Sequence, residues 1–154
     1  MRRNKLNFLK STAILNQNDY IMKQINQLTQ VLIKIIAAVA GLKGKGSSQE
    51  AMEMTSQAFS EYLDLDIDAL LKMDTEEMIH TLKCLDAMNH ENLESVADLF
   101  YTLAIAEVRE GSDIDEQSKL LLKRSLSIYK HIEAEGNIYS IDRNHRIVEI
   151  EKLI

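Results

Sequence analysis

Residues 18–42 read NDYIMKQINQLTQVLIKIIAAVAGL and decide the fold. Apolar residues recur here at alternating steps of four and three, the spacing of one helix face over about three heptads. These residues are Ile21, Ile25, Leu28, Leu32, Ile35, Val39 and Leu42. Met22, Val31 and Ile36 widen the stripe on both flanks, which favours burial in a bundle over a two-stranded seam. The pattern predicts a helix that begins at Asn18 or Asp19 as its N-cap and ends among the glycines that follow Ala40.

The rest of the chain repeats the helical pattern. Helices are predicted over 47–63, 66–73, 74–88, 89–110, 113–135 and 140–154. Those that begin at 47, 74, 89 and 113 are opened by a cap signal, such as the capping box Ser47-Ser-Gln-Glu50. The 154 residues include no Pro and only 5 Gly, which argues against a sandwich or barrel with its frequent turns. Short loops place sequential helices antiparallel. We therefore expect an all-α antiparallel bundle, with a basic N-terminal arm over residues 1–17 and a single helical domain over residues 18–154.

Charge is unevenly distributed along the chain. Residues 1–45 contain eight Lys and Arg against one Asp, a net +7, whereas residues 46–154 contain ten Lys and Arg against 23 Asp and Glu, a net −13. The basic segment could dock on the acidic body, within the chain or across a dimer; it could contact an anionic partner; or it could be a solvated tail. Nucleic acid is not expected as a partner, because the basic residues are not interleaved with aromatic ones and the body would repel phosphates.

Compartment signals are few. No membrane span is expected, since the most apolar run, residues 31–42, is shorter than the ~18–20 residues needed and contains Lys34. The first residues lack the apolar core of a secretory signal. The only cysteine, Cys84, cannot form an internal disulfide, which indicates a reducing cytoplasm.

Two stretches resemble known families. Phe100-Tyr-Thr-Leu-Ala104, Gly111, Ser118 and Ser125-Leu126 follow the order of a tetratricopeptide repeat, although Ala104 replaces a Gly, Ser118 and Ser125 replace alanines, and no Pro closes the unit. The segments NDYIMKQI (18–25) and YLDLDIDALL (62–71) are similar to a bacterial family of uncharacterised helical proteins, often labelled tetratricopeptide-like. This resemblance covers the chain from about residue 18 onwards and implies a fold but no activity.

Two short motifs could hold a metal. His80 and Cys84 stand four residues apart on a predicted helix, a chelating spacing, but a structural zinc site needs four ligands and the sequence supplies no second pair. Asp64, Asp66 and Asp68 mimic the start of a calcium loop, yet Ala69 and Thr75 occupy the positions that need Gly and Glu. A polar surface histidine beside a buried cysteine explains the first motif more simply. In the second motif, Leu65 and Ile67 indicate burial of alternate side chains.

Two further patterns partly match functional motifs. A carboxylate di-metal site needs two Glu-x-x-His motifs, and the sequence offers one in Glu77/His80 and an Asp variant in Asp142/His145. The loop GLKGKGSS (41–48) has the lysines and serines of a phosphate loop but not the Walker spacing, and no strand precedes it. We therefore expect no catalytic, cofactor or metal site.

The function expected from these observations is a non-enzymatic protein–protein interaction module that self-associates, at least as a homodimer, in a bacterial cytoplasm. A helix of about 25 residues is ~37 Å long, more than one shorter neighbour can cover. The predicted interface residues are Ile21, Met22, Ile25, Leu28, Val31, Leu32, Ile35, Ile36 and Val39. One alternative is a peptide-binding tetratricopeptide-like adaptor, which a groove lined with Tyr, Asn and Lys would favour. The other is a small metal-dependent enzyme, which a buried cluster of acids and histidines would favour.

Overall fold

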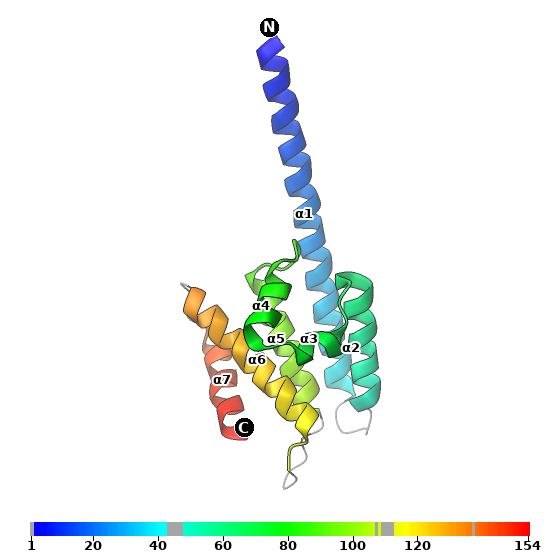
Figure 1. The fold of residues 1–154 in the computed structure, drawn as a ribbon, viewed down its shortest axis with the longest axis vertical. Coiled ribbons are helices and arrows are strands. Elements are labelled where there is room, and N and C mark those ends of the chain that lie inside the picture. Colours follow the sequence, from blue (N-terminus) through cyan, green and yellow to red (C-terminus); the bar gives the residue numbers. More distant parts are fainter. Residues whose placement is uncertain (1, 43–47, 107, 109–112, 137) are drawn as a thin grey trace.

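The chain folds into a bundle of antiparallel helices (Figure 1), as expected. The computed structural model describes residues 2–42, 48–106, 108, 113–136 and 138–154, with side chains from residue 16 onwards. Within these ranges there are seven helices and no strand. They are α1 (Arg2–Gly41), α2 (Ser48–Leu63), α3 (Ile67–Lys72), α4 (Thr75–Lys83), α5 (His90–Ile105), α6 (Glu116–Glu135) and α7 (Ile141–Leu153).

Helix α5 forms the centre of the bundle. It contacts α1, α2 and α6, while α7 packs on α6 and forms ion pairs with α5. A helix with neighbours on several sides must be apolar around much of its circumference, and α5 buries residues from Leu93 to Ala104 on more than one face. The Phe100 ring lies 6.2 Å from the Phe59 ring, measured between centroids, and thereby joins α5 to α2.

Side-chain caps fix where the shorter helices begin. Asp74 accepts a hydrogen bond from the backbone N–H of Glu77 at 2.8 Å, and Asn89 accepts one from Asn92 at 2.9 Å. Asp66, Asp115 and Ser140 cap α3, α6 and α7 in the same way. These caps satisfy backbone donors that a helix leaves open, so the predicted starts of these helices are confirmed to within one or two residues.

Three predicted helix boundaries are wrong. The helix over 89–110 ends at Ile105, with Ala106 as its C-cap. The helix over 74–88 ends at Lys83, because residues 84–87 form turns and the Asn92 side chain donates to the Ala87 carbonyl at 2.9 Å. The first helix begins at Arg2 rather than at Asn18 or Asp19. Residues 2–40 contain neither Gly nor Pro, so nothing in this part of the sequence interrupts the helix.

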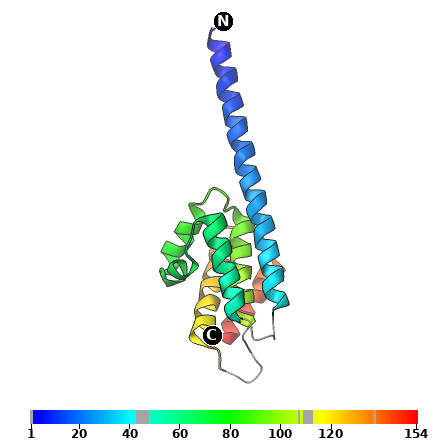
Figure 2. The same ribbon diagram turned by 90° about the vertical axis from the view of Figure 1, so that its right-hand side faces the viewer.

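Helix α1 is much longer than its neighbours. Its 40 residues span about 60 Å at 1.5 Å per residue, and only its C-terminal part lies on the body of the molecule. Both ribbon views show the N-terminal part projecting beyond every other helix (Figures 1 and 2). The N-terminal arm and the first domain helix are therefore one continuous element.

Helices α5 and α6 approach closely along small residues. Ala104, Ser118 and Ser125 are all buried between them, and the Ser125 hydroxyl donates to the Ala97 carbonyl at 2.7 Å. Arg124 ties α6 to the short helices, since its guanidinium donates to the Leu71 carbonyl at 3.2 Å and to the Thr75 hydroxyl at 2.9 Å. The small residues and the Ser125 hydrogen bond let α6 lie close against α5. The Arg124 hydrogen bonds hold α3 and α4 on α6.

Candidate interaction site

The apolar stripe of α1 divides into a buried and an exposed part. Leu28, Leu32, Ile35 and Val39 lie in the core of the same chain, where α1 contacts α2 and α5, and are at most 7% exposed. Val31 and Ile36 are partly buried against the same core. Ile21 and Ile25 are half-buried, whereas Met22 is 54% exposed. Of the predicted interface residues, Met22 at the N-terminal end is the one that is more than half exposed.

The exposed end of the stripe adjoins the projecting arm. Residues 16–20 are all exposed, and Tyr20 presents 62% of its surface to solvent. An isolated helix of ~12–15 residues is marginal in water, so a projecting helix of this length gains stability from a partner. The sequence of the arm is basic, with Arg2, Arg3, Lys5 and Lys10 and no acidic residue.

A second feature is an open groove of about 900 Å³ between α2, α3 and α6. Two neighbouring rows of α2 form one wall, at steps of four residues. The rows are Ser48, Met52, Ser56, Ser60 and Gln49, Glu53, Gln57, Glu61. Buried apolar residues, Ile67, Leu103 and Leu121, lie at its base, and Asp68 adds a third carboxylate. The residues that line this groove include Glu and Asp but no Lys or Arg.

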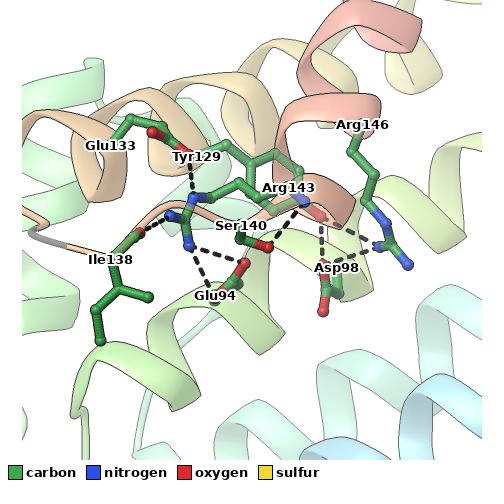
Figure 3. Close-up of polar contacts among 8 residues, drawn as sticks. All are labelled: Glu94, Asp98, Tyr129, Glu133, Ile138, Ser140, Arg143 and Arg146. Atoms are coloured by element: carbon green, nitrogen blue, oxygen red, sulfur yellow. Dashed lines mark hydrogen bonds and ion pairs between the residues drawn. The ribbon is translucent and has the colours of Figure 1, made fainter.

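A polar cluster joins α7 to α5 and α6 (Figure 3). Its centre is Arg143, which is only 5% exposed. The guanidinium donates to Glu133 at 2.6 Å, to Glu94 at 3.2 Å and to the Ile138 carbonyl at 2.8 Å. Two carboxylates and a carbonyl thus satisfy a nearly buried cation, which is the condition under which a charge is tolerated inside a protein.

A second arginine completes the cluster. Arg146 pairs with Asp98 at 2.9 Å, and Asp98 also accepts a hydrogen bond from the Tyr129 hydroxyl (Figure 3). Burial and the neighbouring Asp98 carboxylate raise the pKa of Tyr129 well above its ordinary value. Arg146 also lies over the Tyr101 ring, 5.0 Å from its centroid. These contacts satisfy one another and hold α7 in place.

Sequence reasoning missed this cluster. Arg143 lies 49 residues from Glu94 in sequence, and no local pattern marks it as buried. The helix over 140–154 carries apolar residues, including the fully buried Ile150, and nothing in its sequence indicates that a charged contact also attaches it. Arginine is the residue type best suited to that role, because its planar fork binds two carboxylates at once.

The candidate metal ligands do not converge. His80 on α4 and Cys84, the C-cap of this helix, lie side by side, with 3.6 Å between the ring nitrogen and the sulfur. Cys84 is exposed, so the expectation of a buried cysteine is wrong. Asp66 is occupied as the N-cap of α3. Glu77 and His80 lie on α4, and Asp142 and His145 lie on α7. In the part of the chain that the structure describes, no three His, Cys, Asp or Glu side chains are grouped so that they could hold a metal ion. Most of the glycine-rich loop, residues 43–47, lies outside the described residues.

Comparison with known proteins adds no further assignment. The chain matches no protein-family model, and no curated protein or solved structure was found to be similar to it. The described helices include none that combines the length and the apolar character needed to cross a bilayer. The fold and the surfaces described above define an all-α bundle with a projecting basic helix, and its function has to be argued from these surfaces.

Proposed function

We propose that this protein is a non-enzymatic interaction module that self-associates through the N-terminal end of helix α1. The observation that carries the proposal is the division of the α1 stripe. Its C-terminal part is buried in the body, whereas Tyr20 and Met22 are more than half exposed at the base of a helix that projects into solvent. An exposed apolar patch beside a helix with no neighbour is typical of a protein contact.

Charge favours a second copy of this chain as the partner. Residues 1–17 carry four positive charges and no negative one, and residues 46–154 carry a net −13. Two arms side by side would repel each other, whereas an arm that lies on the acidic body of another copy is attracted to it. Because every copy carries both a basic arm and an acidic body, two copies can each place an arm on the body of the other.

Light scattering at micromolar concentration tests the proposal. We expect a particle of twice the 17.6-kDa chain mass. The double variant Tyr20→Glu/Met22→Glu should weaken association by at least ~10-fold, because it places charge in an apolar contact without touching the core. The melting temperature of the body should hardly change, since both side chains are exposed.

The matched control is Ile138→Glu/Tyr139→Glu. These two residues are 82% and 66% exposed and precede α7, away from α1. The control should leave the dimer intact. If the wild-type protein has the mass of a single chain, the proposed self-association is wrong. If the control variant is monomeric and the α1 variant is still a dimer, the contact lies near α7 and not at α1.

The alternatives gain less support. The buried small residues Ala104, Ser118 and Ser125 support a tetratricopeptide-like packing of α5 on α6. However, the groove between α2, α3 and α6 is lined mainly by Ser, Gln and Glu, and not by the Tyr, Asn and Lys expected for a peptide-binding adaptor. No observation on the described residues favours the metal-dependent enzyme. A reducing cytoplasm stays part of the proposal, because Cys84 is an exposed free thiol.

A further inference from the structure

The groove between α2, α3 and α6 has the shape and charge to receive a basic helix. The α2 wall from Ser48 to Glu61 is about 20 Å long at 1.5 Å per residue, and residues 2–17 of α1 form a helix of about 24 Å. The serines at 48, 56 and 60 are small enough for another helix to come close to α2. A helix that lies in a groove with an apolar base is a common mode of protein recognition.

The chemistry of the groove selects its occupant. Its charged lining residues, Glu53, Glu61 and Asp68, are all acidic. Within the described residues no Lys or Arg forms an ion pair with any of the three, and Glu53 has only the neutral Gln49 side chain as a partner at 3.2 Å. Anionic ligands would be repelled here. A cationic helix with apolar residues would satisfy both the carboxylates and the buried base.

The arm of the chain itself has this composition. Residues 2–17 combine four basic residues with Leu6, Phe8, Leu9, Ile14 and Leu15. The arm cannot reach the groove of its own chain, because α1 is unbroken from Arg2 to Gly41 and its N-terminal part points away from the body in both views (Figures 1 and 2). The groove of a second copy has no such restriction.

We infer that each copy inserts its N-terminal arm into the α2–α3–α6 groove of the other copy, so that two arms are exchanged in a closed dimer. Such an arrangement is isologous, because the arm and the groove of each chain meet the groove and the arm of its partner. This inference rests on the proposed self-association and adds the surface that receives α1.

A charge-swap experiment on the full-length protein tests this assignment. The groove variant is Glu53→Lys/Glu61→Lys, at two exposed positions, and the arm variant is Lys5→Glu/Lys10→Glu. Each variant alone should associate at least ~10-fold more weakly than the wild type, because like charges then face each other. When the two are mixed, the changed side chains of each arm and each groove again meet side chains of opposite charge, so a heterodimer that is tighter than either variant homodimer should form.

A control reversal is Glu76→Lys/Glu151→Lys, at two exposed carboxylates that do not line the groove. This variant should change the dissociation constant of the dimer by no more than about threefold, because solvent screens charges that lie away from the contact. A wild-type dimer that is insensitive to the groove variant, or two variants that do not restore each other, would overturn the groove assignment and leave the proposed α1 contact standing. A wild-type monomer would overturn both.

Discussion

Thr29 on α1 and Asn92 on α5 are joined by a 2.7 Å hydrogen bond between side chains that lie 63 residues apart in sequence. The Asn92 amide nitrogen donates in addition to the Ile25 carbonyl at 3.1 Å and to the Ala87 carbonyl at 2.9 Å. Asn92 is fully buried, so every polar atom of its side chain is satisfied inside the core. A satisfied buried network of this kind fixes one relative position of two helices, whereas apolar contacts tolerate sliding.

Replacing Asn92 by Ala should therefore destabilise the protein by about 2–3 kcal/mol, since it leaves polar groups of α1 and of the turn unpaired. Thr29→Val should lower the free energy of unfolding by less, about 1 kcal/mol, because it removes only the hydroxyl donor and keeps the shape of the side chain. Urea unfolding of both single variants and the double variant measures the coupling, which we expect to be ~0.5–3 kcal/mol for residues in contact. Strict additivity would show that the pair does not act as a unit.

The Arg143 cluster makes a prediction about α7. Arg143→Met should destabilise the protein by about 2 kcal/mol, less than for a fully buried pair because Glu94 and Glu133 remain about one-third exposed. Arg143→Lys should recover only part of the loss, since an ammonium cannot replace the planar fork. Hydrogen exchange should show faster exchange of α7 amides in Arg143→Met, with α5 unchanged. Uniform loss of protection through the bundle would contradict a local role.

The α1 stripe offers a matched pair of substitutions. Ile35 is 7% exposed and Ile33, two residues earlier on the same helix, is 53% exposed. Ile35→Asp should cost several kcal/mol (on the order of 3–5), because it buries an unpaired carboxylate. Ile33→Asp should change stability by no more than about 0.5–1 kcal/mol, at the level of a surface substitution. Equal denaturant midpoints for the two variants would refute the assignment of the buried face.

Alkaline stability should depend on Tyr101. Burial, the hydrogen bond to Glu149 and the charge of that carboxylate raise the pKa of Tyr101 from 10.0 to about 12. A group whose pKa is raised on folding stabilises the protein below its unfolded pKa, and this contribution is lost as the pH rises to the folded value. Melting temperatures should therefore fall between about pH 10 and 12, and the Tyr101→Phe variant should show a smaller fall over that interval. Parallel curves for the two proteins would contradict the prediction.

Metal removal should have no effect. The described residues contain no group of metal-binding side chains, so treatment with a chelator should leave the melting temperature unchanged. A large downward shift would point to a site built on His80 and Cys84 or on the Glu77/His80 and Asp142/His145 motifs.

Local signals predicted most of the fold. Helix periodicity and the caps at Asp74 and Asn89 are properties of a few neighbouring residues, and they fixed the order and type of the elements. The start of α1 at Arg2 was missed because the arm lacks a regular apolar stripe. A helix there depends on the absence of breakers and not on a pattern.

The surfaces depend on long-range contacts and could be predicted only in part. The stripe of α1 was identified, but its division between core and solvent depends on how far α2 and α5 extend along it. The burial of Arg143 depends on Glu94, which only the packing of α7 brings near. The groove beside α2 was not foreseen either, because its base consists of Leu103 and Leu121 from other helices.

The continuity of α1 has a mechanical consequence. No glycine or proline interrupts the helix between the projecting arm and the first buried turns at Leu28 and Leu32, so the chain has no hinge there. The arm continues the axis of the buried part of α1, so the core sets the direction in which it projects. A partner that binds the arm completes the packing of this helix and is held in the direction that the core sets. The spacing and angle of two joined bodies would then be encoded in the packing of α1 on α5.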